Sequence, residues 1–245
     1  MTHAEPIATN PRAAAPAARA IPDALRLLSE TLEPERRLVR AGDPIYRAGD
    51  RLGCLYVLNS GVFKVVNLTA DGREQVVALK FKGDWLGLDG IAGGRHTCDA
   101  VAIDTGEVWM LRYGALLDAA QRRPELLQLL LQAMSREIAH DRDALMSMCT
   151  LPADARVAEF LRYWADALEQ RGLRTEQITL RMTRAEIGNY LGMTLETVSR
   201  ALSRLARDNV IAFCERGRRE VRIPNIAALH GFVQRSLTPA SPMLQ

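Results

Sequence analysis

Residues 183–200 read TRAEIGNYLGMTLETVSR, and this stretch decides the fold of the C-terminal third of the chain. Thr183 and, three residues later, Glu186 form the pattern of a capping box, which fixes the start of a helix. Gly192 has the backbone freedom that a tight turn needs, and Thr194 is a good N-cap for a second helix. A short helix, a glycine-containing turn and a second helix predict a helix-turn-helix.

The second helix of this motif is predicted to have one polar and one apolar face. At about 100° per residue, Glu196, Ser199 and Arg200 fall together near its N-terminal end. These groups can read base edges, because Arg binds guanine through two hydrogen bonds, Glu accepts one from cytosine, and Ser suits either partner. We therefore expect these three side chains to contact DNA bases. The opposite face is expected to pack inward and comprises Val198, Leu202 and Leu205, with Ile187 and Leu191 of the first helix as partners.

Hydroxyl and guanidinium groups around the same helix suit the phosphates of a DNA backbone. The predicted backbone contacts are Thr183, Thr194, Thr197, Ser203, Arg204 and Arg218. Strand-like residues 210–214 and 220–223 flank the basic sequence Arg216-Gly217-Arg218-Arg219, which predicts the β-hairpin of a winged helix-turn-helix. The alternative is a small helical hairpin inside an enzyme, with Glu196 and Arg200 as an ordinary i,i+4 ion pair.

The charge distribution agrees with a polyanionic partner but does not establish one. The net charge is +3, and residues 150–222 carry all of it, with thirteen Arg, no Lys and ten acidic residues. An excess of this size also fits an ordinary solvated surface.

Residues 38–111 have the sequence pattern of a β domain. Strand-like runs recur about every ten residues between turns, at 54–59, 62–68, 75–81, 97–103 and 107–111. Short strands at this spacing predict an antiparallel sandwich or barrel. Before them, residues 1–20 are rich in Ala and Pro and are predicted to be disordered, while residues 21–32 predict a short helix with Pro22 near its start.

Pro124 opens a helical stretch that runs to about Cys149 and carries a regular seam. Its members alternate spacings of four and three and are Leu127, Leu131, Met134, Ile138, Asp141, Leu145 and Met148. This is a heptad pattern, which predicts that two copies of the helix pair in a dimer. The alternative is an amphipathic helix that lies on its own β domain, which Leu126, Leu129 and Leu130 also fit.

Asp141 is the charged member of the seam. In a symmetric parallel dimer it faces its own copy, and two ionised carboxylates at close range repel. Our hypothesis is that Asp141 weakens the dimer and leaves association open to regulation. Alternatively, Asp141 leans outward to pair with Arg142 or Arg136.

At these residues the chain resembles the CRP/FNR family of bacterial transcription regulators, over nearly its whole length. Residues 182–192, followed by Glu196-Thr197-Val198-Ser199-Arg200, resemble the FNR/FixK branch in particular. The resemblance implies an α+β fold, with an N-terminal antiparallel β-roll of the cyclic-nucleotide-binding type, a long dimerisation helix and a C-terminal winged helix-turn-helix. The expected segments are a disordered segment 1–20, a β-roll sensor-like domain 21–118, the dimerisation helix 119–149, the DNA-binding domain 150–235 and a flexible tail 236–245.

The same resemblance implies a DNA target. In the FNR/FixK branch the Glu-x-x-Ser-Arg pattern reads each half of a TTGAT-type palindrome, so the expected operator is TTGAT-N4-ATCAA. By this resemblance Arg200 holds a guanine, Glu196 the cytosine opposite a guanine, and Ser199 a thymine. The cAMP-responsive branch has an Arg where this chain has Leu195, which disfavours that branch's half-site.

The iron–sulfur sensor of the family is not expected here. Oxygen-sensing members hold a cluster with cysteines near the N-terminus, but no cysteine precedes Cys54, and a further cysteine ligand of the β-roll corresponds to Trp109. A 4Fe–4S cluster needs four converging thiolates or close substitutes. Cys54, Cys98 and Cys149 are expected to be small buried hydrophobes, with a redox switch at one of these or Cys214 left open.

A cyclic nucleotide is not expected either. The family's nucleotide sensors hold the phosphate with a Gly-Glu-Leu turn and a later Arg-Ser pair, which correspond here to Gly83-Asp84-Trp85-Leu86 and His96-Thr97. The phosphate-binding Arg is absent, and a buried phosphate without its cation is costly. His96 is expected to be a surface loop residue rather than a metal or haem ligand. We therefore expect neither cofactor nor metal.

The predicted function is a homodimeric, sequence-specific DNA-binding transcription regulator without enzymatic activity. The sequence has no phosphate-binding glycine loop, no HExxH and no credible Ser/His/Asp set. The expected partners are double-stranded DNA, a second copy and, by resemblance, RNA polymerase, through a loop at residues 71–74. Sparse cysteines and the lack of a long apolar run predict a cytoplasmic protein without membrane contact.

Two alternatives remain open from the sequence. The chain could be a β-roll sensor gated by a small molecule or by redox state, whose C-terminal domain acts on another protein. Within the leading prediction, either an unidentified ligand occupies the β-roll or activity follows the abundance of the protein without a ligand.

Overall fold

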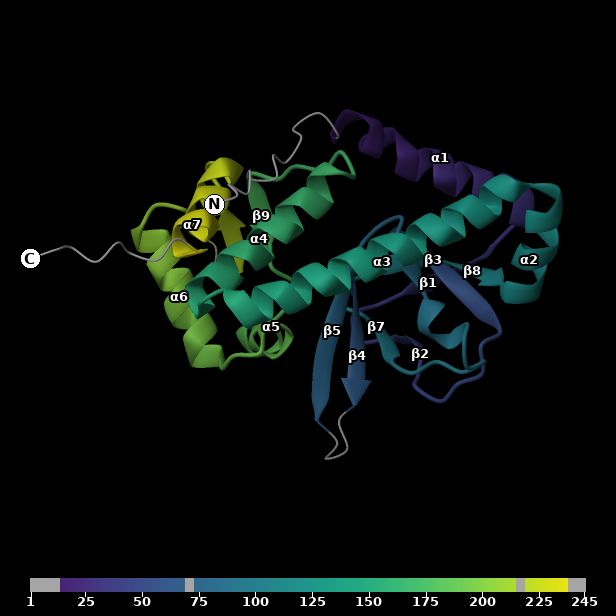
Figure 1. The fold of residues 1–245 in the computed structure, drawn as a ribbon, viewed down its shortest axis with the longest axis horizontal. Helices are drawn as coiled ribbons and strands as arrows, with labels where there is room; N and C mark the ends of the chain where they lie inside the picture. Colours follow the sequence, from purple (N-terminus) through teal and green to yellow (C-terminus); the bar gives the residue numbers. More distant parts are fainter. Residues whose placement is uncertain (1–13, 69–72, 215–218, 238–245) are drawn as a thin grey trace, which may run out of the picture.

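The computed structural model describes residues 14–68, 73–214 and 219–237, and Figure 1 shows two domains linked by a long helix. The N-terminal domain is a β-roll. Its strands are β1 (Glu35–Val39), β2 (Pro44–Tyr46), β3 (Cys54–Ser60), β4 (Phe63–Leu68), β5 (Glu74–Lys80), β6 (Trp85–Leu86), β7 (Asp99–Ala102) and β8 (Gly106–Arg112). They form two antiparallel sheets, ordered β1-β8-β3-β6 and β2-β7-β4-β5.

The two sheets of the roll face each other across an apolar core. Leu58 of β3, Phe63 of β4 and Val108 of β8 have no measurable exposure in this core. The strand alternation that the sequence shows therefore corresponds to one face buried between the sheets. β1, β2 and β6 were not among the predicted strands.

Three helices cover the outer face of the first sheet. They are α1 (Ala14–Leu32), α2 (Tyr113–Arg122) and the long α3 (Pro124–Thr150), and a short 3-10 turn, η1 (Leu88–Gly90), lies between β6 and β7. Leu28, Leu116 and Leu126 from these helices pack with Leu55 of β3 in a second buried cluster. Pro124 occupies the first turn of α3, where its missing N–H costs no helical hydrogen bond.

Several predicted boundaries were wrong. Residues 14–20 are helical rather than disordered, so Pro22 lies inside α1 instead of at its start. Alanine has the highest helix propensity, and five of these seven residues are alanine, which accounts for the longer helix. The boundary expected at residue 119 falls inside α2, and the tail expected from residue 236 begins with the last turn of α7 (Ile226–Leu237).

In the described residues, the C-terminal domain packs four helices with a small sheet. In chain order it contains α4 (Ala153–Glu169), β9 (Gln177–Thr179), α5 (Arg184–Leu191), α6 (Leu195–Arg207), β10 (Ala212–Phe213), β11 (Glu220–Arg222) and α7. The sheet is antiparallel in the order β10-β11-β9. Strands β10 and β11 are the sides of the predicted wing, and residues 215–218 between them lie outside the described residues.

The two domains share a core and several polar contacts. Val76 and Leu79 of β5 belong to the same buried cluster as the C-terminal helices. Asn189 of α5 accepts the backbone N–H of Val76 through its side-chain oxygen at 2.6 Å. Lys64 of β4 pairs with Glu186 of α5 at 2.8 Å. The first helix of the helix-turn-helix is therefore fixed directly to the β4–β5 hairpin, as the proximity of α5 to β5 in Figure 1 shows.

The α+β fold class is confirmed, with the antiparallel β-roll, long helix and winged helix-turn-helix in the expected order. Across the described ranges 14–68, 73–214 and 219–237, no helix combines the length and the hydropathy needed to cross a bilayer.

Candidate DNA-binding interface

The capping box at the start of α5 is confirmed. The Thr183 hydroxyl accepts the Glu186 backbone N–H at 3.1 Å, and the Glu186 carboxylate accepts the Thr183 backbone N–H at 2.8 Å. Partial burial opposes the charge of Glu186, but donors from Lys64 and Thr183 outweigh it and lower the pKa of this carboxyl. A charged Glu186 is thus held at the positive N-terminal end of α5.

Two glycines make the turn of the motif possible. Gly192 ends α5 in the left-handed region, with φ at 63°. A Cβ on Gly188 would lie 2.5 Å from the Met193 carbonyl oxygen, so only glycine lets α5 approach the turn this closely. The sequence indicated Gly192 through its place after the helix, whereas the role of Gly188 depends on this close approach.

Helix α6 begins as predicted and buries the predicted face. Thr194 is its N-cap and accepts the backbone N–H of Thr197 at 3.3 Å. Val198, Leu202 and Leu205 are at most 2% exposed and pack in one cluster with Ile187 and Leu191. The inward packing predicted from the helical period is therefore confirmed.

The opposite face of α6 presents the predicted base-reading residues. Glu196 and Arg200 are exposed and Ser199 is half-buried. One Arg200 guanidinium nitrogen lies 3.4 Å from the Thr197 hydroxyl, and no acidic group pairs with Arg200 within the described residues. The Glu196 backbone N–H and the Thr194 side chain lower the pKa of the Glu196 carboxyl, which therefore stays ionised as an acceptor. The ordinary Glu196–Arg200 ion pair of the alternative interpretation is not formed.

A shallow depression of about 480 Å³ runs along this face. Its lining residues are Asp154, Ser199, Arg200, Ser203, Arg204 and Arg207. Arg204, a predicted phosphate contact, pairs with Asp154 at the start of α4 at 2.7 Å and approaches Asp208 at 4.0 Å. Arg207 is exposed and is the third arginine, with Arg200 and Arg204, that lines the depression.

The remaining predicted backbone contacts have local partners. The Thr183 hydroxyl also donates to Glu186 at 3.0 Å, and the Ser203 hydroxyl donates to the Ser199 carbonyl at 2.9 Å. The hydroxyls of Thr194 and Thr197 lie 3.1 Å apart. Arg218 lies outside the described residues.

Helix α3 divides its apolar residues between two faces. Leu126, Leu130 and Ala133 are buried against the roll, and half-buried Leu129 packs beside them. Most members of the predicted seam are exposed, but Met134 packs against the roll's buried cluster and Asp141 also lines a cavity between the roll and α3. Exposed members are Leu127, Leu131, Ile138, Asp141, Leu145 and Met148, with Met134 half-buried. One face of the helix covers the chain's own domain, as the second interpretation expects, while pairing through the exposed seam residues remains a prediction.

Asp141 is exposed within the seam. Within the part of the chain that the structure describes, it forms no ion pair with Arg136 or Arg142. In the single chain, therefore, neither arginine neutralises Asp141 as the alternative interpretation expects.

The β-roll does not fit an iron–sulfur cluster. The four cysteines lie apart: Cys54 begins β3, Cys98 precedes β7, Cys149 is near the end of α3 and Cys214 follows β10. The expectation that the first three are buried was wrong, since Cys149 is exposed and the other two are half-buried. Burial raises the pKa of the Cys54 and Cys98 thiols, which disfavours their reactive thiolate forms.

His96 was also wrongly placed at the surface. It is 3% exposed and stacks on Tyr46, with ring centroids 3.8 Å apart. Nothing in the neighbouring sequence indicated this burial, because Tyr46 is fifty residues away in the chain.

The fold and the exposed face of α6 together define a winged helix-turn-helix regulator of transcription. Residues 155–232 match the Crp-like helix-turn-helix domain, and residues 36–123 match the cyclic nucleotide-binding domain. The fumarate and nitrate reduction regulatory protein of Vibrio cholerae is 35% identical over 177 residues, which cover 72% of this chain and 71% of that protein. Its counterpart in Escherichia coli K12 is 34% identical over the same shares of both chains.

Among solved structures, FixK2 from Bradyrhizobium japonicum superposes with a TM-score of 0.72 at 29% identity, covering 85% of this chain and 99% of FixK2. The chain belongs to the CRP/FNR family of transcription regulators and is a DNA-binding protein of that family.

Proposed function

We propose that the chain is a homodimeric regulator that recognises the palindrome TTGAT-N4-ATCAA. In each half-site Arg200 donates two hydrogen bonds to a guanine, Glu196 accepts from the cytosine opposite a guanine, and Ser199 contacts a thymine. The observation that carries the proposal is the exposure of Glu196 and Arg200 on α6, with no ion pair to either among the described residues, directly opposite a fully buried apolar face.

The proposed dimer forms through the seam of α3. Leu131 is 55% and Leu145 62% exposed in the single chain, and such residues favour burial against another apolar surface. Pairing the two helices brings two recognition helices to successive major grooves about 34 Å apart, which explains why the operator should be a palindrome. Asp141 faces its copy in this dimer and weakens it.

The side chains proposed to contact phosphates around α6 differ in whether an ion pair within the protein already holds them. Thr194, Thr197, Ser203 and Arg207 border the exposed face, whereas Arg204 must exchange its partner Asp154 for a phosphate. Thr183 flanks the start of α5, and the proposed contact of Arg218 comes from the wing. We further propose that the protein acts in the cytoplasm and contacts RNA polymerase through the loop at residues 71–74, of which residues 71 and 72 lie outside the described residues.

The test is an electrophoretic mobility shift with a TTGAT-N4-ATCAA duplex over a series of salt concentrations. We expect tight binding by the aerobically purified protein without any added ligand, with affinity falling steeply as salt rises because phosphate contacts release counterions. A duplex with the guanine of each half-site replaced is the matched control and should bind far more weakly. Equal binding to both duplexes would contradict the proposed target, and no binding at low salt would contradict the proposed function.

A further inference from the structure

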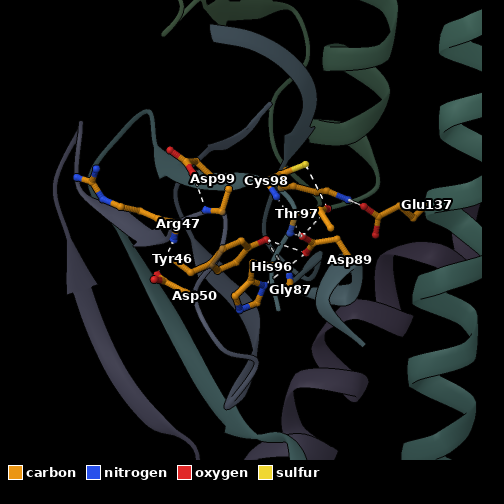
Figure 2. Close-up of polar contacts among 12 residues, drawn as sticks. Tyr46, Arg47, Asp50, Gly87, Asp89, His96, Thr97, Cys98, Asp99 and Glu137 are labelled. Carbon is orange, nitrogen blue, oxygen red and sulfur yellow. Dashed lines mark hydrogen bonds and ion pairs between the residues drawn. The ribbon is translucent and has the colours of Figure 1, made fainter. Parts of the chain in front are cut away.

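One carboxylate in the β-roll collects three hydrogen-bond donors. Oδ2 of Asp89 accepts the Thr97 backbone N–H at 2.6 Å, the Thr97 hydroxyl at 3.1 Å and the Cys98 backbone N–H at 3.3 Å. Asp89 lies in η1, and its donors lie at the other end of the following loop, so the carboxylate closes that loop on itself. Figure 2 shows these contacts converging on Asp89.

The second oxygen of the same carboxylate faces a buried aromatic pair. Oδ1 of Asp89 lies 3.5 Å from the Tyr46 hydroxyl and 3.6 Å from Nδ1 of His96. The Tyr46 hydroxyl in turn accepts the buried backbone N–H of Gly87 at 3.0 Å. Burial, with the nearby Asp89 charge, raises the pKa of Tyr46, so its hydroxyl keeps the proton that it offers to Asp89. The Tyr46 hydroxyl is therefore the donor to this second oxygen, whereas Nδ1 of His96 forms no hydrogen bond within the described residues (Figure 2).

These donors are the kind that bind a phosphate. A backbone N–H pair with an adjacent hydroxyl forms a small concave site for an anion. They are contributed by two consecutive residues, Thr97 and Cys98, and converge on a single oxygen. In this chain a side chain of the protein itself already satisfies them.

The adjoining cavity is unfavourable for a second anion. It has a volume of about 260 Å³ and opens between the roll and α3. Its charged lining residues are Asp89, Glu137, Asp141 and Lys80, and the only cation of the set pairs with Glu137 at 2.8 Å. A phosphate entering this space would meet two further carboxylates, of which Asp141 forms no ion pair among the described residues.

We infer that the Thr97 and Cys98 donors of the β-roll form an anion-binding site, which the carboxylate of Asp89 fills. The site is therefore ordered without a ligand, and an anionic ligand would have to displace Asp89 before it could bind. This inference deepens the proposed function, because it gives a physical reason for DNA binding without an effector.

The test is rescue of a missing carboxylate in the full-length protein, with inorganic phosphate as the probe. Asp89→Ala removes the acceptor shared by the Thr97 and Cys98 donors and that of the part-buried Tyr46 hydroxyl, and we expect the thermal unfolding midpoint to fall by about 5 °C. Sodium phosphate should restore most of that loss, compared with sodium chloride at equal ionic strength. The wild-type protein should gain little from phosphate, since its site is already filled.

A matched control separates this site from a general effect of phosphate. Asp99 also accepts a backbone N–H, that of Ala48 at 2.7 Å, but it collects no second backbone donor among the described residues. Asp99→Ala should lose stability without a phosphate-specific recovery. Should Asp89→Ala not fold, Asp89→Ser keeps one hydrogen-bonding group, leaves room for an anion, and should show the same recovery.

Two outcomes would overturn the inference. One is a phosphate response of the Asp89 variants no larger than that of Asp99→Ala. The other is a wild-type response as large as theirs, which would mean that Asp89 does not occupy the site. Neither outcome depends on DNA, so failure to bind the palindrome would overturn the proposed function and leave the assignment of Asp89 intact.

Discussion

The recognition helix and the β-roll pocket treat their polar groups in opposite ways. On α6, Glu196 and Arg200 are exposed and have no ion-pair partner among the described residues. In the roll, Asp89 and Thr97 satisfy each other, and His96 is packed under Tyr46. Polar groups that a fold leaves without partners are available to another molecule, whereas groups that it pairs internally stabilise the fold itself. The comparison predicts that changes on α6 alter DNA binding and changes in the roll alter stability.

The largest expected effect is the loss of DNA affinity in Arg200→Ala. Each half-site loses a bidentate contact of about 1–3 kcal/mol, and a palindrome has two half-sites, so affinity should fall by about 30-fold or more. Fluorescence anisotropy with the palindromic duplex measures this loss. Arg122→Ala removes an exposed Arg from α2, at the opposite end of the molecule from α6 in Figure 1, and should bind nearly as well as the wild type.

The next largest effect is expected from a change in the exposed seam of α3, and it tests whether this seam forms the dimer interface. Leu145→Glu places a charge in the predicted dimer interface and should give monomers in sedimentation velocity, with DNA affinity about tenfold lower or worse. Met146→Glu is the matched control, because Met146 is 60% and Leu145 62% exposed on the same helix, but Met146 points about 100° away. Equal dissociation of both variants would show that the seam has no special role.

A third prediction concerns the β-roll, where polar groups are paired within the protein. Tyr46→Phe removes the hydroxyl that accepts the Gly87 backbone N–H and leaves that buried donor without its partner. The free energy of unfolding in urea should fall by about 1–3 kcal/mol. Affinity for the palindrome should stay within about twofold of wild type, and a large loss of DNA binding would break the distinction between the two regions.

Asp141→Ala should tighten the proposed dimer by about fivefold, or about 1 kcal/mol, because it removes a pair of facing carboxylates. Analytical ultracentrifugation over a dilution series gives the dissociation constant. A dimer no tighter than the wild type would reject the repulsion hypothesis.

The smallest effect is a pH dependence at the contact between the domains. Because the folded state lowers the pKa of Glu186, its charge stabilises the protein above the ordinary carboxyl pKa of 4.5, and this stabilisation is lost as the pH falls through the lowered value. After solvent screening, Glu186→Gln should cost about 0.5–1 kcal/mol at pH 7. Urea unfolding of both proteins should show the difference shrinking below pH 4.5. A difference that stays constant with pH would contradict the role of the charge.

The features that the sequence predicted correctly depend on neighbouring residues. The capping box spans three residues, the turn needs Gly192, and the polar and apolar faces of α6 follow from the helical period. Such local preferences do not depend on how the rest of the chain folds. The exposed face of α6 and the uncovered seam of α3 could therefore be located before the structure.

The features that it missed depend on distant residues. His96 is buried because Tyr46 stacks on it, and Asp89 is paired because a loop brings Thr97 back to it. The edge strand β2 has three residues, too few for a pattern. α2 and α7 carry weak local signals and are fixed by the cores that they cover. The cysteines were misjudged for the same reason, since burial is decided by packing and not by residue type.

Glu186 has a consequence for exchanging domains between relatives. Its carboxylate both caps α5 and forms an ion pair with Lys64 of the roll. The position of the helix-turn-helix is therefore coupled to the β4–β5 hairpin. A chimaera that joins this C-terminal domain to a foreign roll would keep the cap and lose the cation. A chimaera built to carry the DNA specificity of this protein should therefore be more stable when Lys64 is moved together with the residues proposed to touch the bases.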